Sequence, residues 1–396
     1  MSIYSSTPST REWPLSTDRF DPYSSEHVKA LATRFGTPLF VIDLNVIRDQ
    51  YRALKNALPM VDLHYALKPL PQVDVVKALW DLDASFDIAT KGEIKVVRQA
   101  KVDAKRCIHT HPMKTDVEIR EAIRFGIDTF VVDNVEEAAK FRRYRQKVQL
   151  LIRLSFPAKD AVCDLSKKFG LRPEDVPAAW EQIRAMNIKV AGFSFHVGSQ
   201  TPSSAMTVHA IDVVRTLCRE ASSDAVRDIS VIDIGGGFPV SYTEPVMGID
   251  EYARPIVKAL ENLPPSVKVL AEPGRFIAAP AGTVITSVVG RAQRAGMWWY
   301  YLDDGLYGCF NGRLYDHARY PISTTGSGVV SSAVLAGPTC DSIDVIESEI
   351  DVPELEIGDF VVGHVMGAYT HASSSEFNSI PKAKTLVLDN HSAWIA

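Results

Sequence analysis

Eight short apolar runs, each followed by a stretch with helical spacing, recur between about residue 60 and residue 275. The runs are LHYALK, SFDIAT, RCIHTH, TFVVDN, QLLIRLS, GFSFHVG, VIDIGGG and VLAEPG. Runs of this kind predict buried strands, and the amphipathic segments between them predict helices that cover the sheet. Eight such units, of roughly 25 to 30 residues each, favour a (β/α)8 barrel of the TIM type. A doubly wound open sheet stays the alternative, because the sequence does not show closure.

The pattern changes after about residue 280. GTVITSVVGRAQ, WWYYLDDGLYG, SGVVSSAVLAG, DFVVGHVMGAY and KTLVLDN are typical of strands separated by Gly, Asp and Ser turns. At 396 residues the chain exceeds the usual size of a single core. We therefore expect a barrel over residues 37–279 and an all-β domain over residues 280–396. PLFVIDL near residue 40 is similar to the later strands, so residues 1–36 are expected to form an arm that packs on the β domain.

Composition and charge exclude several classes of partner. Lys plus Arg number 43 against 48 Asp plus Glu, with no long run of either sign, so nothing recommends a nucleic acid or an anionic membrane. The longest uncharged apolar stretch, residues 276–290, is too short to span a bilayer. The start of the chain is polar and has no apolar signal region, which favours a cytoplasmic protein.

The cysteines and histidines give weak indications of metal chemistry. Five cysteines without a CxxC spacing argue against both a disulfide framework and a structural zinc site. His109 and His111 alternate along a strand and could hold a metal, but no carboxylate or further histidine is near them in sequence. Ordinary strand side chains are the favoured interpretation, and no metal is expected.

Polar side chains stand where the predicted strands end. In a barrel of this type the active site is built at the carboxyl ends of the strands, where the βα loops open. The side chains and glycines at these ends form a convergent set: Lys68, Asp87, His111, Arg153, His196, Ser199, Gly235, Gly236, Gly237, Glu272 and Arg275.

The chemistry of this set points to an aldehyde that carries a phosphate. Desolvation would lower the pKa of Lys68 and make it a nucleophile toward an aldehyde. The glycines of DIGGGFP let backbone N–H groups approach an anion, and Arg275 adds a fixed positive charge. Glu272 could keep a pyridinium nitrogen protonated, and His196 offers a flat ring for stacking. Each residue alone could be an ordinary ion pair or a tight loop at the barrel mouth, but together they favour a cofactor site.

The same segments resemble the fold-type III pyridoxal-phosphate decarboxylases, the family that acts on ornithine, lysine, diaminopimelate and related amino acids. The matching segments run from about residue 38 to residue 380: YALK, FDIATKGEI, FGL, SFHVGSQ, DIGGGFP, EPGRF, DDGLYGCFN, LYDH, AGPTCDSIDVI and GAYT. The resemblance implies an alanine racemase-like barrel followed by a β domain, with pyridoxal 5′-phosphate as cofactor. The sequence departs from the family after the lysine, where Pro69 and Leu70 replace the usual Cys-Asn or Ala-Asn pair.

The resemblance also implies roles for individual residues. Lys68 resembles the Schiff-base lysine, Glu272 the partner of the ring nitrogen, and His196 the residue stacked on the ring. Asp87 and Arg153 match positions around the cofactor, with Glu93 nearby. The residues that resemble the phosphate cradle are Ser199, Gly235, Gly236, Gly237, Gly274, Arg275 and Tyr369.

In this family the loop equivalent to AGPTCDSIDVI reaches into the site of a second subunit, which implies a homodimer with shared active sites. Cys340 would return a proton to the substrate. Asp316, with Tyr315 beside it, and Asp341 would bind a terminal ammonium. Two carboxylates disfavour a substrate with a second carboxylate, so the predicted reaction is decarboxylation of L-ornithine, L-lysine or both.

Three other functions stay open. A decarboxylase of the diaminopimelate or carboxynorspermidine type is the alternative within the family. A racemase on the same fold is disfavoured, because such racemases lack the GPTCDS loop. A non-catalytic regulatory binder, similar to the antizyme inhibitors, is the alternative from another class.

Overall fold

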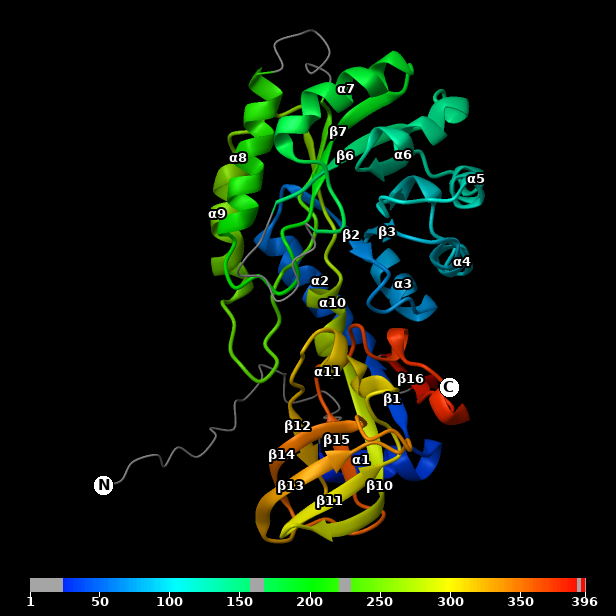
Figure 1. Cartoon of the computed structure of the whole chain (residues 1–396), viewed down its shortest axis with the longest axis vertical. Coiled ribbons are helices and arrows are strands. Elements are labelled where there is room, and N and C mark those ends of the chain that lie inside the picture. The colour runs from blue at the N-terminus through cyan, green and yellow to red at the C-terminus, as the bar shows by residue number, and fades with distance from the viewer. Residues whose placement is uncertain (1–23, 157–166, 221–228, 390–392, 396) are drawn as a thin grey trace, which may run out of the picture.

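The computed structural model describes residues 24–156, 167–220, 229–389 and 393–395, which form two bodies (Figure 1). The upper body in Figure 1 is a barrel surrounded by helices, and the lower body is a sheet. The chain enters through the sheet, completes the barrel and then returns to the sheet. Both N-terminal and C-terminal segments therefore contribute to one domain.

The upper body is a closed barrel of eight parallel strands. These are β2 (Val61–Ala66), β3 (Ser85–Ile88), β4 (Cys107–His109), β5 (Thr129–Val132), β6 (Gln149–Leu154), β7 (Lys189–Phe195), β8 (Val231–Asp233) and β9 (Lys268–Ala271). Each predicted run supplies one strand. Closure comes from β9 pairing with β2, where Val269 lies opposite Val61. The predicted barrel is confirmed, and the open-sheet alternative is wrong.

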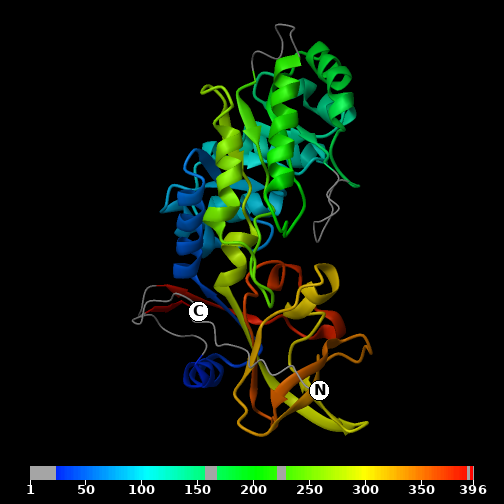
Figure 2. The ribbon, with the colours of Figure 1, turned by 90° about the vertical axis from the view of Figure 1, so that its left-hand side faces the viewer.

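Helices alternate with these strands and cover the outside of the barrel (Figure 1). They are α2 (Leu44–Ala57), α3 (Val73–Trp80), α4 (Lys91–Gln99), α5 (Asp116–Phe125), α6 (Val135–Ala139), α7 (Val176–Ala185), α8 (Ala205–Glu220), α9 (Ile249–Leu260) and α10 (Arg275–Ala278). Figure 2 shows α8 and α9, in green and yellow-green, side by side on the face turned to the viewer.

Local sequence signals begin and end these helices. Helix α5 is preceded by its N-cap Thr115, whose side chain and that of Glu118 cap each other's backbone N–H groups. It ends at Gly126, whose φ of 117° lies in the left-handed region. In α2, Ile47, Tyr51 and Leu54 recur at helical spacing and are buried against the barrel.

The lower body is a mixed nine-stranded sheet. Its strands are β1 (Leu39–Asp43), β10 (Gly282–Arg294), β11 (Met297–Leu302), β12 (Ile322–Thr324), β13 (Val330–Ala336), β14 (Val345–Pro353), β15 (Phe360–Gly363), β16 (Lys384–Asp389) and β17 (Ala393–Ile395). The predicted β domain is confirmed. It also holds helix α11 (Gly312–Tyr315) and, in the part that the structure describes, the 3₁₀ turns Cys309–Asn311, His371–Ser373 and Phe377–Ser379. Further 3₁₀ turns in the barrel are Ala104–Arg106, Lys140–Tyr144, Pro173–Asp175 and Ala279–Ala281.

The N-terminal segment is built into this sheet. Strand β1 pairs with β10 on one side and with β16 on the other. Helix α1 (Ser25–Phe35) packs its buried Val28 and Leu31 in a cluster that also contains Val41, Ile285 and Leu386. The segment around residue 40 therefore lies with the β domain. The exact domain boundaries stay a prediction, and most of the predicted N-terminal arm lies outside the described residues.

A layer of apolar side chains fills the barrel and leaves its mouth for polar residues. The layer takes one residue from each of six successive strands: Ile108, Val131, Leu151, Ala191, Val231 and Leu270. Residues two positions further along several of these strands are polar, among them Arg153 and Glu272. The functional side chains therefore lie at the carboxyl ends of the strands. No described helix is long and apolar enough to cross a membrane.

Candidate active site

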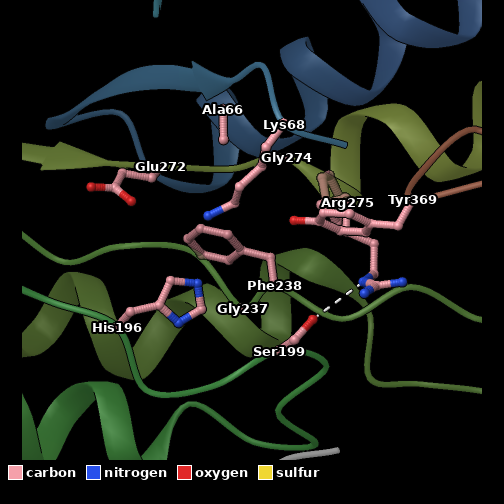
Figure 3. A pocket seen from close by; sticks show the side chains of 11 residues that line it. Ala66, Lys68, His196, Ser199, Gly237, Phe238, Glu272, Gly274, Arg275 and Tyr369 are labelled. Carbon is pink, nitrogen blue, oxygen red and sulfur yellow. Dashed lines mark hydrogen bonds between the residues drawn. The ribbon is translucent and has the colours of Figure 1, made fainter. Parts of the chain in front are cut away.

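A pocket at the barrel mouth collects side chains from the ends of several strands and from the β domain (Figure 3). It is lined by Ala66, Lys68, His196, Ser199, Gly237, Phe238, Glu272, Gly274, Arg275, Phe276 and Tyr369. All but Ala66, Phe238 and Phe276 were predicted from the sequence as site residues. Tyr369 comes from the loop after β15, so the β domain completes the wall of the pocket.

Lys68 follows β2, and its side chain points into the pocket near Glu272 and Tyr369 (Figure 3). Backbone hydrogen bonds fix this turn: the Leu67 N–H donates to the Asp87 carbonyl at 3.2 Å, and the Tyr369 N–H donates to the Pro69 carbonyl at 3.1 Å. Pro69 therefore joins the end of β2 to the β domain. A Cβ on Gly274 would lie 2.6 Å from the Pro69 ring, so this glycine lets the two loops meet.

The environment of Lys68 differs from the one expected from the sequence. The side chain is exposed, because it projects into the open pocket, although protein atoms surround that pocket on most sides. Desolvation by those surrounding atoms lowers the pKa of its ammonium group, but Tyr369, Asp87 and Glu272 together raise the pKa above its usual value. The prediction of a water-shielded lysine with a lowered pKa is therefore wrong for this structure. A neutral, nucleophilic amine at Lys68 therefore requires that a bound group offset the effect of Tyr369, Asp87 and Glu272 on its pKa.

The carboxyl groups around Lys68 hold their protons unusually tightly. Burial raises the pKa of Asp87 to about 7, and nearby Glu272 acts in the same direction. Asp87 accepts a hydrogen bond from the Thr110 hydroxyl. Burial also raises the pKa of Glu272 well above its usual value, and the carboxylate of Asp233 on the neighbouring strand adds to this effect. Both groups are therefore ready to accept a cation, because an opposite charge favours the ionised carboxylate.

The glycine-rich loop after β8 lies too close to its neighbours for any side chain. Gly235 has a φ of 68°, and a Cβ there would lie 2.2 Å from the Phe195 carbonyl oxygen. Gly237 has a φ of 99°, and its Cβ would lie 2.4 Å from the Gly198 carbonyl oxygen. Only glycine fits such positions. The loop therefore brings its backbone against the loop after β7, which carries Ser199.

Arg275 is the fixed positive charge of the site. It is buried, with 8% of its surface exposed. Its Nε donates to the Ser199 hydroxyl at 3.3 Å (Figure 3), and its guanidinium lies 4.7 Å from the centre of the Tyr369 ring. A serine hydroxyl, a glycine-rich backbone and an arginine are the donor set that a phosphate monoester requires. The residues present therefore fit the phosphate of pyridoxal phosphate.

Sequence reasoning missed one partner of this arginine. Arg275 Nη1 donates to the Tyr242 hydroxyl at 2.9 Å, and Nη2 forms an ion pair with Asp316 at 2.8 Å. Tyr242 lies in the loop after β8, beyond the quoted glycine motif, and a lone tyrosine in a loop gives no signal in the sequence. Asp316 was predicted as a substrate residue, and the structure brings it to the arginine of the cradle.

His196 presents a neutral ring to the pocket. Burial lowers the pKa of the imidazole well below its usual value, and the charges of Lys68 and Arg153 act in the same direction. Its Nδ1 accepts a hydrogen bond from the Gly198 N–H at 3.1 Å, which fixes the ring orientation. A neutral, fixed ring is suited to stacking on a flat cofactor.

Two further strand-end residues stand apart from the pocket wall. Arg153 lies over the Phe169 ring at 5.5 Å and influences the pKa values of the groups around Lys68. His111 accepts a hydrogen bond from the Met113 N–H at 3.0 Å and meets the edge of Phe169. His109 is fully buried and stacks on Phe130 at 5.7 Å.

In the described ranges, no group of three or more His, Cys, Asp or Glu side chains could hold a metal ion.

The predicted proton donor and the three predicted substrate residues do not line the Lys68 pocket of the same chain; of these, Asp316 lines the neighbouring cavity that also reaches Ser199 and Arg275. Cys340 is exposed, and its Sγ accepts from Asn378 Nδ2 at 3.1 Å. Asp341 accepts a hydrogen bond from the Tyr307 hydroxyl, and the Tyr307 ring stacks on Phe377 at 4.3 Å. Tyr315 is 70% exposed.

Tyr307 and Phe377 were not predicted as site residues. Tyr307 lies within a segment that resembles the family, so its neighbourhood gave a signal, whereas nothing in the sequence singled out Phe377. We call Tyr307, Cys340, Asp341 and Phe377 the thiol patch.

Comparison with known proteins gives consistent results. The family model described as "Pyridoxal-dependent decarboxylase, pyridoxal binding domain" matches residues 44–279. The curated lysine/ornithine decarboxylase of Selenomonas ruminantium is 33% identical over 374 residues, which cover 94% of this chain and 95% of the relative. The solved lysine/ornithine decarboxylase of Vibrio vulnificus, complexed with cadaverine, is 50% identical with a TM-score of 0.88 and covers 93% of this chain and 100% of that one. The structure named SrLDC in complex with PLP and cadaverine is 32% identical with a TM-score of 0.87, and the match covers 93% of this chain and 94% of that one.

Proposed function

Because this chain belongs to the pyridoxal-dependent decarboxylases, enzymes that remove CO₂ from basic amino acids, we propose that it converts L-ornithine, L-lysine or both to putrescine and cadaverine. The observation that supports this choice is a carboxylate, Asp316, at the edge of a site whose other members suit an aldehyde phosphate. Asp316 lines a cavity of about 290 Å³ that also reaches Ser199 and Arg275. A carboxylate at the far end of an amino-acid site favours a second ammonium group and disfavours a second carboxylate.

We propose that the pocket residues hold pyridoxal 5′-phosphate as follows. Lys68 would join the aldehyde carbon, and Glu272 would face the ring nitrogen, while His196 would lie against the ring. Asp87 and Arg153 would set the charge around these groups. Ser199, Gly235, Gly236, Gly237, Gly274, Arg275 and Tyr369 would surround the phosphate. When bound, the cofactor supplies an electron sink for the pair of electrons left at Cα when CO₂ departs.

Residues of the protein itself would hold and transfer the protons of the reaction. Glu272 stands ready to ionise beside a ring cation, since a positive neighbour lowers the pKa that burial has raised. Tyr369, Asp87 and Glu272 raise the pKa of Lys68 and so favour its charged form, and a further cation beside these groups would offset that effect. The loss of CO₂ leaves Cα in need of one proton, and we assign its return to the thiol of Cys340.

We further propose that the thiol patch completes the site of a second copy of this chain. Cys340 is exposed and lies outside the Lys68 pocket of its own chain. Asp341 and Asp316 from different subunits would then hold the terminal ammonium between them, with Tyr315 beside it. A homodimer with two shared sites follows from this arrangement. The predicted cytoplasmic location stays a prediction.

Product analysis with purified, cofactor-loaded protein tests the proposal. We expect release of putrescine from L-ornithine or of cadaverine from L-lysine. Ornithine and lysine differ by one methylene, which is worth about 1 to 3 kcal/mol of discrimination, so turnover of both is consistent with the site. Turnover of diaminopimelate alone, or of carboxynorspermidine alone, would contradict the proposed substrate class. An imine absorbance band at about 420 nm separates a loaded enzyme from a non-catalytic binder.

A further inference from the structure

Arg275 joins the two ends of the proposed site, which the proposed function treats separately. This inference rests on that function, because it concerns the same cofactor phosphate and the same diamine. The Nε of Arg275 reaches Ser199 on the phosphate side, at 3.3 Å. Its Nη2 reaches Asp316 on the substrate side, at 2.8 Å. A single guanidinium therefore lies between the anion cradle and the carboxylate proposed to bind a cation.

The position of this guanidinium is fixed from several sides. Tyr242 accepts a hydrogen bond from Nη1 at 2.9 Å, and the Tyr369 ring lies over the guanidinium. Tyr242 is itself supported by Tyr320, whose ring meets it edge-on at 5.8 Å. Tyr242 and Asp316 therefore bind two different nitrogens of the same guanidinium. The arrangement holds the ion pair in one geometry.

The Arg275–Asp316 ion pair is shielded from water, so its two charges interact strongly. The side chains of Arg275 and Asp316 are 8% and 19% exposed. Charges with so little contact with water interact more strongly than charges on an open surface. In this structure the positive charge of Arg275 compensates the negative charge of Asp316. Asp316 is then a weaker partner for an incoming ammonium group than an isolated carboxylate would be.

A phosphate in the cradle changes this balance. A guanidinium has five N–H donors, so Arg275 can hold a phosphate and Asp316 together. A phosphate monoester carries about one and a half to two negative charges near neutral pH, more than one arginine compensates. The potential around Asp316 then becomes more negative, and the carboxylate regains its attraction for a cation. Conversely, an ammonium on Asp316 leaves more of the charge of Arg275 for the phosphate.

We propose that the Tyr242–Arg275–Asp316 contact couples the two ends of the site, so that an anion in the phosphate cradle and a diamine at Asp316 bind with positive cooperativity. Coupling between sites is reciprocal, so each ligand raises the affinity of the other by the same factor. The protein would therefore accept its diamino ligand strongly only after the phosphate end is filled. Tyr242 is a positioning residue in this scheme, since it acts through its hydrogen bond to the arginine.

Calorimetric titration of putrescine into the full-length protein, freed of cofactor, tests the coupling with inorganic phosphate as the probe. The affinity for putrescine is measured in chloride buffer and in phosphate buffer of equal ionic strength and pH. We expect phosphate to tighten putrescine binding at least about fivefold, the lower end of typical coupling between sites. Titration of phosphate with and without putrescine must give the same factor. Equal putrescine affinities in both buffers, or no binding in either, would overturn the proposal.

Three variants identify the residues responsible. Asp316→Asn should remove the effect of phosphate on putrescine binding, because the linked charge is gone. If Asp316→Asn keeps the effect, the phosphate acts through the general field and not through this ion pair, and the proposal fails. Tyr242→Phe keeps the charges of Arg275 and Asp316, and it should reduce the factor by which phosphate tightens putrescine binding by about half or more. Asp74→Asn, which breaks an exposed ion pair with Lys77 on α3, is the matched control and should leave the factor unchanged.

The result is separable from the proposed function. If the loaded enzyme decarboxylates ornithine or lysine but shows no coupling, only this inference falls. If it decarboxylates neither, the proposed substrate is wrong whatever the titration shows. Thermal unfolding of each variant, compared with that of the unchanged protein, excludes loss of the fold as the cause of lost coupling.

Discussion

At the scale of single residues, Lys68 and Cys340 have different roles in the proposed reaction: Lys68 would attach the cofactor, and Cys340 would return the proton to Cα. Lys68 lies in the pocket, whereas Cys340 lies in the thiol patch. Lys68→Ala should abolish the imine absorbance at about 420 nm and reduce turnover by several orders of magnitude, because the covalent attachment is lost. Cys340→Ala should keep the absorbance and slow the formation of the correct amine. Absorbance spectra and product analysis of both variants check this. Turnover by Lys68→Ala at the rate of the unchanged enzyme would show that the site is assigned wrongly.

The raised pKa of Asp87 predicts how stability depends on pH. Its usual pKa is 3.8, and in the folded protein burial raises it to about 7. Between about pH 4 and pH 7 the folded protein therefore holds a proton that the unfolded chain has released. The free energy of unfolding must fall as pH rises through this window, by up to about 1.4 kcal/mol per pH unit for one proton.

This dependence can be measured with protein freed of cofactor. Asp87→Asn keeps the shape of the side chain but cannot titrate, so its unfolding temperature should fall less between pH 5 and pH 7.5 than that of the unchanged protein. Asp49→Asn, on the exposed face of α2, is the control and should show the unchanged slope. Parallel curves for Asp87→Asn and the unchanged protein would contradict the assignment. Glu93, whose pKa burial also raises to about 7, contributes a similar slope that both proteins retain.

At the scale of elements, the loop after β8 depends on its glycines to form the proposed phosphate cradle. Gly237→Ala should weaken the binding of pyridoxal phosphate by at least about tenfold, because the added methyl would collide with the Gly198 carbonyl at a backbone angle that favours glycine. Gly248→Ala is the control: nothing lies within 4 Å of its added Cβ and its φ is −61°. Cofactor titration followed by absorbance checks both. Equal affinities for the two variants would show that the loop adapts and is not a rigid cradle.

The elements were largely predictable from the sequence because their signals are local. Each barrel strand is a run of apolar residues that the chain marks by itself, and a glycine triplet after a strand identifies the loop beside it. Closure depends on Val61 meeting Val269, a contact between distant segments that leaves no local pattern. Tyr242 and Phe377 were missed for the same reason, since each acquires its importance only from a neighbour far along the chain.

The charge state of Lys68 was the main error at the site, and its cause is physical. Burial alone argues for a lowered pKa, which is the only effect that a sequence suggests for a single residue at a strand end. The structure adds Tyr369, Asp87 and Glu272 from three other elements, and their combined effect is larger. A pKa depends on all the groups of the assembled site. The identities of the site residues were therefore predictable, but the net effect of burial and neighbouring charges on the pKa of Lys68 was not.

At the scale of the whole molecule, the proposed role of Cys340 depends on a second subunit. In one chain the patch lies outside the Lys68 pocket, so neither half is a complete site. The patch exposes Cys340 and, in part, the Phe377 ring, 41% of whose residue surface is accessible. An exposed aromatic ring beside functional groups is typical of a surface that another chain covers. Each proposed active site then takes its lysine from one subunit and its thiol from the other.

Mixing the two impaired variants tests this arrangement directly. Co-expression of Lys68→Ala and Cys340→Ala chains in equal amounts should give mixed dimers in which one site has both residues intact and the other has neither. Random pairing makes half of all dimers mixed, so activity should recover to roughly a quarter of that of the unchanged enzyme. Lys68→Ala co-expressed with the chain that carries both substitutions is the control and should show no recovery. If each chain built a site from its own Lys68 and Cys340, no pairing of the two single variants could restore an intact site, and the mixture would stay at the level of the variants alone.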